Sequence, residues 1–248
     1  MSKLAIITVH KGSILNLEKT IKSVLSQIEK PKKFLIITPH IQNLFVKKYK
    51  KIKFIKFIVG RDKSIYNAMN IGLNLTKKNS ILFLNSGDIF YDKNCTKIAS
   101  KYLKKKSKFI NIFKVVLRHN KSLFFPKKKY FLSKSYLPHP GFIRPPIINN
   151  NYFIKYIENF ETISDGIWML SNTKIFKQQK ISKNFVIHEL GGVSTVPTFK
   201  LMNEKFRLSK SHFIKETLKF LLYKAIGQTL YYRLIYFNKF NFNESKKK

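Results

Sequence analysis

The sequence predicts an α/β fold in which a mainly parallel sheet is flanked by helices. The first observation is that short apolar runs of strand length alternate with segments of helical periodicity over residues 1 to about 90. The second is that polar or glycine-containing turns separate these segments. The third is a hydrophobic fraction of 44% and an aromatic fraction of 15%, which suffice for a folded core despite the high charge.

The elements of the first half follow one another in a regular order. Strands are predicted over residues 4–9, 34–37 and 54–59, and a helix over residues 41–49. The first helix, with Asn16 as a plausible N-cap, is indicated by apolar residues at helical spacing: Leu17, Ile21, Val24, Leu25 and Ile28. A later helix shows one apolar face, with Asn67, Asn70 and Asn74 lying away from it: Ile65, Ala68, Met69, Gly72 and Leu73.

Acidic residues lie in loops that follow two of these strands. Arg61 and Asp62 lie in the loop after the third strand. The short apolar strand over residues 80–84 runs directly into a tight loop that ends in Asp88. Because ligands of open α/β sheets bind at the carboxyl ends of the strands, we expect a ligand site at this edge of the sheet.

The sequence after Asp92 is less regular. A helix is predicted over residues 95–103 and strands over 109–117 and 123–125, followed by a proline-rich stretch. Near the C-terminus an apolar stripe flanked by lysines predicts a basic amphipathic helix. The stripe consists of Ile214, Leu218, Leu221, Leu222 and Ala225, and the lysines are Lys210, Lys215, Lys219 and Lys224.

The net charge of +37 comes from 49 basic and 12 acidic residues and implies attraction to nucleic acid, phospholipid headgroups or phosphorylated substrates. Alternatively, the scattered lysines form a solvated surface that reflects the composition of an AT-rich genome. The single cysteine, Cys95, excludes an internal disulfide and a cysteine-based zinc site. No apolar run reaches the ~18 residues of a membrane span, and we expect a cytosolic or peripheral protein.

Three carboxylates are candidates for chemistry. Asp88 could hold a divalent cation, since hard cations take carboxylate oxygens; the alternative is that Ser86, Gly87 and Asp88 form an ordinary turn. Asp62 could contact a base or ribose, and Arg61 could bind phosphate or pair with Asp62. Asp165, at the start of a segment with helical character, could act as a general base or cap the helix.

Two histidines and a glycine pair remain open. His139 and His188 could contact phosphate, complete a metal shell or orient a substrate, although a lone histidine is more often structural. Gly191 and Gly192 would suit a loop that closes over a ligand or a plain turn. The sequence contains no GxSxG, GxxxxGK[ST], GxGxxG or HExxH motif.

Taken together, the motifs resemble the family 2, GT-A type glycosyltransferases of bacterial polysaccharide and lipopolysaccharide assembly. The resemblance runs from about Leu4 to about Thr195. Its central motifs are RDKSIYNAMNIG and FLNSGDIF, and its weaker outer motifs are IITVHKGSILNLEKTIKSVLSQ, HPGFIR, ISDGIWML and GGVST. The resemblance implies a GT-A (Rossmann-like) domain over residues 1–205, with a nucleotide-sugar half over 1–92 and an acceptor half over 93–205. Residues 206–248 would form a basic helical extension.

The resemblance also implies roles for individual residues. Asp88 matches the last acid of the family's DxD-like metal motif, so it would bind Mn²⁺ or Mg²⁺, with His188 as a second metal ligand. Asp165 matches the catalytic base of an inverting transfer. Donor-binding residues would be Thr8, His10, Arg61, Asp62, Tyr66, Asn67, Asn70, Ser86 and Gly87. Acceptor-side residues would be His139, Arg144 and Trp168.

The chain departs from the family pattern at two places. The loop after the second strand, ITPHIQN near His40, lacks the usual acid, which puts donor base recognition in doubt. Ser86 replaces the first acid of the metal motif, which leaves Asp88 as the only direct carboxylate ligand.

The function predicted by the resemblance is transfer of a sugar from a nucleotide-diphospho-sugar to a glycan or lipid-linked acceptor. The C-terminal aromatic and basic residues would contact an anionic membrane or pack on the domain itself: Tyr231, Tyr232, Arg233, Tyr236 and Phe237. The alternatives are a basic nucleic-acid-binding protein and an inactive protein of the same fold. No nucleic-acid partner is expected, since no recognised motif is present.

Overall fold

The computed structural model describes residues 3–60, 63–105, 108–147, 152–191, 196–208 and 210–244. Its strands are β1 (Leu4–Val9), β2 (Lys33–Thr38), β3 (Ile55–Val59), β4 (Ser80–Phe83), β5 (Ile89–Phe90), β6 (Ile110–His119), β7 (Ser122–Pro126), β8 (Phe142–Arg144), β9 (Gln178–Glu189) and β10 (Phe240–Glu244). Its helices are α1 (Ile14–Leu25), α2 (Asn43–Tyr49), α3 (Ile65–Leu75), α4 (Cys95–Lys105), α5 (Lys128–Leu132), α6 (Ser164–Ile175), α7 (Phe199–Leu208) and α8 (Lys210–Phe237), with a 3-10 turn η1 (His139–Gly141).

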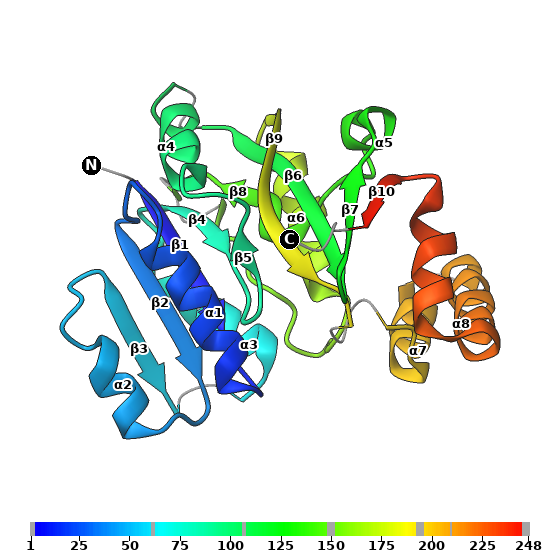
Figure 1. The fold of residues 1–248 in the computed structure, drawn as a ribbon, viewed down its shortest axis with the longest axis horizontal. Coiled ribbons are helices and arrows are strands. Elements are labelled where there is room, and N and C mark those ends of the chain that lie inside the picture. The colour runs from blue at the N-terminus through cyan, green and yellow to red at the C-terminus, as the bar shows by residue number, and fades with distance from the viewer. Residues whose placement is uncertain are drawn as a thin grey trace.

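The described strands form one mixed sheet of ten strands with helices on both faces (Figure 1). Its order is β10-β7-β6-β8-β4-β1-β2-β3, and β9 pairs with β5 and β6. The pairs β1–β2, β1–β4 and β2–β3 are parallel, as the alternating pattern of the first half predicts. The predicted α/β fold, with a parallel core flanked by helices, is therefore confirmed.

Alternation along β1 explains how helices cover both faces of the sheet. Ile6 packs in a core with α1 and α4, whereas Ile7 packs in a second core with α3 and α6. Successive side chains of a strand point to opposite faces, so a continuous apolar run requires helices on each side. All six residues of β1 are buried.

Several local expectations were wrong. Helix α1 ends at Leu25, and Ile28 lies beyond it with 61% of its surface exposed. Ser13, not Asn16, occupies the N-cap position, because the helix begins two residues before Asn16. In α3, Asn70 is buried and Ile65 is exposed, because the segment after residue 152 covers the polar side of the helix.

The second half of the sheet is largely antiparallel. β8 runs against β4 and β6, and β7 runs against β6 and β10, whereas β9 runs parallel to β6 with a register irregularity at Lys114. Strand β9 was not predicted from the sequence. Its lysine, serine and asparagine residues obscure the apolar run that ends in Phe185, Val186 and Ile187.

The C-terminal region belongs partly to the sheet and partly to a helical pair. Helix α7 precedes α8, in which Gly227 (φ 75°, ψ 169°) interrupts the helical backbone. Strand β10 then returns to pair with β7 (Figure 1). Of the two alternatives for Tyr231 and Tyr232, contact with a membrane or packing on the domain itself, the structure shows the second, because both are buried with Phe124, Leu190 and Phe240.

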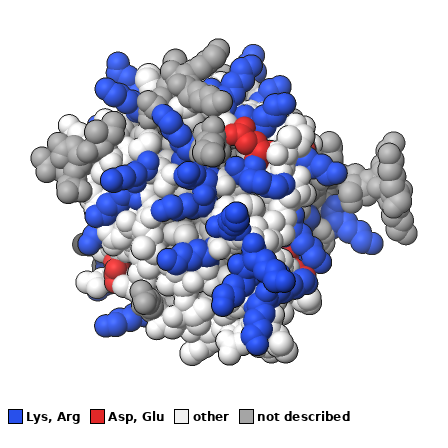
Figure 2. All heavy atoms as spheres, turned by 90° about the vertical axis from the view of Figure 1, so that its left-hand side faces the viewer, with Lys and Arg blue, Asp and Glu red and all other residues white. Residues whose placement is uncertain are grey.

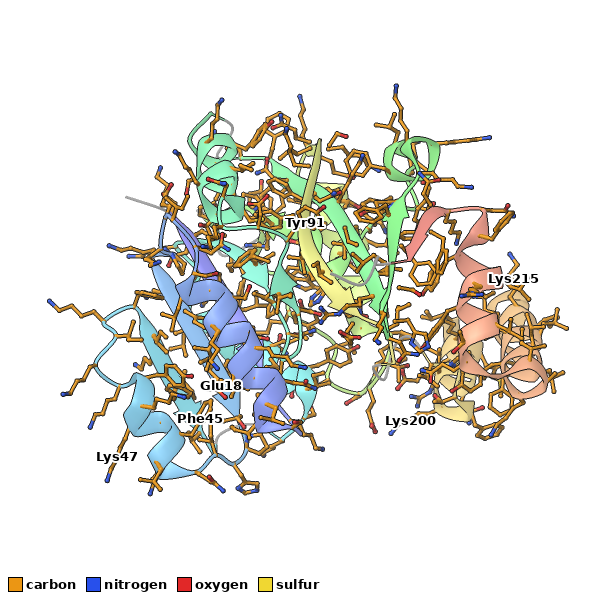
Figure 3. The ribbon with its side chains drawn as sticks, in the orientation of Figure 1. Glu18, Phe45, Lys47, Tyr91, Lys200 and Lys215 are labelled. Carbon is orange, nitrogen blue, oxygen red and sulfur yellow. The ribbon has the colours of Figure 1, made fainter. Side chains whose placement is uncertain are left out.

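Lysine side chains are spread over the face that carries the β3 edge of the sheet, with few acidic residues among them (Figure 2). In α2, Phe45 packs against Tyr49 and Phe57, while Lys47 on the same helix is exposed (Figure 3). This distribution agrees with lysines on a solvated surface around an apolar core. Among the described helices, none is long and apolar enough to cross a membrane.

Candidate active site

The carboxyl ends of the parallel strands β1 and β4 lie side by side, and hydrogen bonds link the residues that end β1 to the loop that follows β4. The Thr8 hydroxyl donates a hydrogen bond to the Leu84 carbonyl, and the His10 Nδ1 lies 3.0 Å from the Ser86 Oγ. Both Thr8 and His10 are buried, and burial lowers the pKa of His10. The parallel strands thus bring residues that are 76 positions apart to one edge of the sheet, as the fold predicted.

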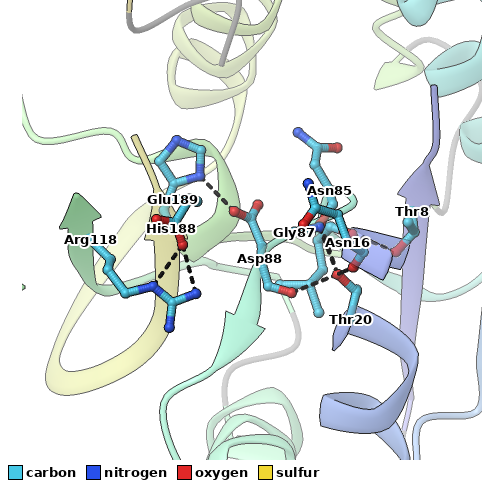
Figure 4. Close-up of polar contacts among 10 residues, drawn as sticks. Thr8, Asn16, Thr20, Asn85, Gly87, Asp88, Arg118, His188 and Glu189 are labelled. Atoms are coloured by element: carbon cyan, nitrogen blue, oxygen red, sulfur yellow. Dashed lines mark hydrogen bonds and ion pairs between the residues drawn. The ribbon is translucent and has the colours of Figure 1, made fainter. Parts of the chain in front are cut away.

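A threonine of α1 shapes the loop before Asp88. The Thr20 hydroxyl accepts a hydrogen bond from the Gly87 amide at 2.9 Å and donates one to the Asp88 carbonyl at 2.9 Å (Figure 4). Gly87 has φ +104°, a left-handed conformation that favours glycine. A Cβ at this position would lie 3.8 Å from the Asn16 side chain, so there is room for a side chain. The backbone conformation, and not a steric clash, is therefore what favours glycine here.

Asp88 faces His188 across a short ladder. Ile89 pairs with Ile187 in the antiparallel β5–β9 pair, which sets the preceding Asp88 opposite His188. The distance from His188 Nδ1 to Asp88 Oδ1 is 2.7 Å, and Asp88 is 3% exposed (Figure 4). Burial lowers the pKa of His188, but the charge and hydrogen bond of Asp88, with the charges of Glu189 and Asp165, outweigh burial and raise it.

Two oxygens of this loop fit a divalent cation. Asp88 Oδ2 and Asn85 Oδ1 are buried, and no described residue donates a hydrogen bond to either. An unsatisfied buried oxygen is costly, and a cation is one partner that satisfies it. Within the described parts of the chain no three His, Cys, Asp or Glu side chains lie together in a way that could hold a metal ion.

Asp165 lies in the first turn of α6. The helix begins at Ser164 with Ile163 as its N-cap, and the Asp165 carboxylate accepts a hydrogen bond from the Gly166 amide at 2.8 Å. Asp165 therefore does not occupy the capping position. Burial raises the pKa of Tyr66, and the negative charge of Asp165 raises it further. The same charge opposes the effect of burial on the pKa of His139 and of His188.

His139 packs in a cluster of aromatic side chains next to the candidate site. Its ring stacks on Phe83, and its Nε2 lies 2.8 Å from the Tyr156 hydroxyl. Trp168 stacks on Tyr156 with ring centroids 4.8 Å apart, and Tyr66 stacks on the same ring at 5.6 Å. Burial lowers the pKa of His139 despite the opposing charges of Asp165 and Asp88, so the ring is neutral.

The two asparagines expected at the donor hold a neighbouring segment. Asn70 exchanges two hydrogen bonds with the Tyr156 backbone and donates a third to Glu158, and Asn67 donates to the other oxygen of Glu158. These contacts position Tyr156 under His139. In the structure Asn67 and Asn70 therefore support the site, and direct donor contact by them stays a prediction.

Arg144 and Trp168 are interior residues. Arg144 is fully buried, and its guanidinium donates to Asn172, Pro145 and Tyr152. Trp168 is 1% exposed and donates to the Ile154 carbonyl. Both pack behind the site, and contact with an acceptor stays a prediction for them. Arg61, Asp62 and Gly192 lie outside the described residues.

A cavity adjoins the loop and extends toward the end of β9. Its volume is about 1070 Å³, which is ample for a nucleotide-sized ligand. Lys19, Lys22, Lys93 and Arg118 are among its lining residues, and Arg118 pairs with Glu189 at 2.6 Å (Figure 4). The sequence did not point to Thr20, Asn85, Tyr156 or Arg118, because their roles depend on contacts between residues 65 to 86 positions apart.

Comparison with known proteins supports the fold. No family model and no curated protein matches the sequence. Residues 1–349 of Staphylococcus aureus TarS in complex with UDP-GlcNAc superpose with a TM-score of 0.67 at 14% identity, covering 94% of this chain and 76% of that one. The mannosyltransferase PcManGT from Pyrobaculum calidifontis, in complex with GDP-Man and Mn²⁺, gives 0.60 at 9% identity, with 95% and 79% covered.

A longer TarS structure matches at a TM-score of 0.61 and 14% identity over 93% of this chain. The chain spans 45% of the length of that structure. At these identities the similarity concerns the fold. The chain therefore shares the α/β fold of these solved structures.

Proposed function

We propose that the protein is a metal-dependent, inverting glycosyltransferase that moves a sugar from a nucleotide-diphospho-sugar to a glycan or a lipid-linked acceptor. The observation that carries the proposal is the Asp88–His188 pair at the end of β4, with a buried carboxylate oxygen that no described residue satisfies. The solved structures of the same fold support it, since their complexes contain UDP-GlcNAc or GDP-Man with Mn²⁺.

In this proposal Asp88 and His188 would hold Mn²⁺ or Mg²⁺, which when bound would supply positive charge to neutralise the departing nucleotide diphosphate. The loop of Ser86 and Gly87 lies where the diphosphate would bind. Thr8, His10 and Tyr66 would lie on the donor side of the site, and contacts of Arg61 and Asp62 with the nucleoside stay a prediction. The lysines and Arg118 around the cavity favour a phosphorylated ligand electrostatically.

Asp165 removes the proton from the acceptor hydroxyl as that oxygen attacks the anomeric carbon. The new bond joins the acceptor oxygen to that carbon, and the bond to the nucleotide diphosphate breaks on the opposite side, which inverts the centre. His139, neutral and held by Tyr156, borders the acceptor side. We propose cell-surface polysaccharide synthesis at the inner face of the cytoplasmic membrane as the setting.

The direct test is a thermal-shift screen of UDP, GDP, dTDP and CMP sugars with and without Mn²⁺. Ligand at about 100 times its dissociation constant stabilises the folded state by about 2.7 kcal/mol, so a matching donor raises Tm clearly. Asp88→Asn should abolish the Mn²⁺-dependent part of the shift. The control Glu161→Gln, at an exposed acid that does not line the cavity, should keep it. A shift that is identical in Asp88→Asn and wild type would contradict the proposal.

A further inference from the structure

The second segment of α8, from Gln228 to Phe237, has two different faces. Tyr231 and Tyr232 are buried in the core with Phe124, Leu190 and Phe240. On the opposite side, Leu230, Leu234 and Phe237 are 54%, 58% and 72% exposed. Their spacing of i, i+4 and i+7 aligns these exposed apolar side chains along one stripe of the helix.

Cations accompany this stripe. Arg233 lies within it by helical spacing, and its guanidinium stacks over the Phe242 ring at 4.9 Å. Lys127 lies over the Phe237 ring at 5.4 Å, and its Nζ donates to the Phe237 carbonyl at 3.0 Å. We call Leu230, Arg233, Leu234 and Phe237, with Lys127 and Phe242, the α8 outer surface.

A cavity of about 370 Å³ opens within the α8 outer surface. Phe124, Tyr236, Phe237, Phe240 and Phe242 provide apolar walls, and Lys127 and Arg233 provide the charges. Between Glu216 and Glu244 the sequence contains no Asp or Glu, whereas it contains Lys219, Lys224, Arg233 and Lys239. The surface is therefore apolar, cationic and concave, which complements an anionic group attached to an apolar chain.

We propose that the α8 outer surface docks the protein on an anionic phospholipid bilayer, with a headgroup phosphate in the cavity between Lys127 and Arg233. Leu230, Leu234 and Phe237 would enter the interface between headgroups and acyl chains, as apolar faces of amphipathic helices do. Arginine suits phosphate through its planar array of donors. This inference does not depend on the proposed transferase activity. Docking on a bilayer would, however, bring the candidate active site close to a lipid-linked acceptor.

A second copy of the chain fits the α8 outer surface less well. In a two-fold dimer the same patch meets itself, so the cations of the two copies would oppose each other. Nucleic acid would match the charge but leave the three exposed apolar side chains in water. A bilayer with anionic lipid satisfies both the charge and the apolar area.

The inner face of the same segment contacts the candidate active site region. Leu190, which packs against Tyr231 and Tyr232, follows His188 by two residues. A Cβ at Gly191 would lie 3.5 Å from the Gln228 Nε2, which places the start of the segment against this strand end. One helix, about 10 Å across, therefore separates the proposed lipid surface from the strand end that carries His188.

The test is flotation of the full chain with vesicles of phosphatidylcholine alone and of phosphatidylcholine mixed with phosphatidylglycerol. We expect flotation with the anionic vesicles only, weakened by salt. Leu234→Ser with Phe237→Ser should lower partitioning more than tenfold, since each substitution removes an apolar side chain that would enter the bilayer interface. Arg233→Gln should lower it about fivefold.

Leu44→Ser is the matched control. Leu44 is 78% exposed on α2 and lies near Lys47 and Lys48, so it combines apolar exposure with positive charge elsewhere on the molecule. It should float like wild type, and so should Asp88→Asn, which separates docking from the transferase proposal. Equal flotation of the Leu234→Ser, Phe237→Ser variant and wild type would overturn the proposal. So would a dimer in light scattering that this variant abolishes while flotation is unchanged.

A fluorescent variant gives a second measurement that does not rely on loss of binding. Phe237→Trp adds an indole to an exposed position, whereas the native Trp168 is 1% exposed and provides a constant background. Anionic vesicles should shift the new emission to the blue as the indole leaves water. An unchanged spectrum under conditions of flotation would contradict insertion at Phe237.

Discussion

Asp88 and His188 carry the site at the scale of single residues. They are 100 positions apart, and their side chains meet at 2.7 Å. The second carboxylate oxygen of Asp88, Oδ2, is buried, and no described residue donates a hydrogen bond to it. The same holds for the Oδ1 of Asn85, three residues earlier. A sequence pattern identified Asp88, because a carboxylate after a buried strand is unusual in a chain with 12 acids. The pairing with His188 required the register of β5 and β9.

Asp165 should matter for turnover and not for donor binding. Asp165→Asn removes the proposed proton acceptor but keeps the oxygen that accepts from the Gly166 amide. We expect transfer to fall about 10²- to 10⁴-fold, as for other general bases, with the donor-induced shift in Tm unchanged. Glu161→Gln, at an exposed acid four positions before Asp165, is the control. A variant that retains wild-type turnover would remove Asp165 from the mechanism.

His139 should make the fold less stable in acid. Burial lowers its pKa from the ordinary value of 6.5, so below that value the unfolded chain binds a proton that the folded state takes up less readily. Its contribution to the free energy of unfolding therefore falls as pH drops below 6.5. His10 acts in the same direction, and His188, whose pKa is raised, acts in the opposite one.

The measurement for His139 is urea unfolding about one pH unit above and about one below 6.5. Comparison of wild type with His139→Gln isolates this residue, because the other histidines are common to both proteins. His139→Gln should lose less stability on acidification. An equal loss in both proteins would show that His139 titrates normally in the folded state.

At the scale of elements, the turn from β4 to β5 depends on α1. Thr20 holds both Gly87 and Asp88, so the position of the helix determines where the candidate metal ligand lies. The apolar stripe of α1 predicted the helix itself. Its polar contact with the loop was not predictable, because Thr20 is one of many threonine and serine residues without a local pattern.

Two glycine-to-alanine changes should have opposite effects on stability. Gly87→Ala places a Cβ at φ +104°, which costs about 1–3 kcal/mol. Gly166→Ala lies in α6, has no atom within 4 Å of the new Cβ and should stabilise by about 0.5–1 kcal/mol. Urea unfolding of both variants checks the pair. Destabilisation by Gly166→Ala would indicate a contact that the structure lacks.

At the scale of the whole molecule, the C-terminal region is continuous with the sheet. Strand β10 pairs with β7, and Tyr231 and Tyr232 pack against Leu190 and Phe124. The sequence analysis separated residues 206–248 as an extension, on the basis of a change from mixed to helical and basic character. That boundary stays a prediction, but the described part of the region shares a core with β7 and β9.

Tyr232→Ala should therefore destabilise the protein as a core substitution does. Tyr232 is 0% exposed, and removal of a large buried ring costs about 3–5 kcal/mol. Leu234→Ala, two residues on and 58% exposed, should change stability by about 0.5 kcal/mol or less. Thermal unfolding measures both. If Tyr232→Ala left the main transition unchanged, the C-terminal region would unfold separately from the sheet.

The sequence by itself determined the parallel half of the sheet, the two helices that cover its faces and the loop that ends in Asp88. These features follow from local periodicity, because apolar runs and helical stripes specify which surfaces must be buried. It did not determine the position of β9, the burial of Asn70, the exposure of Ile65, or the burial of Tyr231 and Tyr232. Only the tertiary structure decided these, since pairing and burial depend on which distant segments meet, and His188 reaches Asp88 through such a pairing.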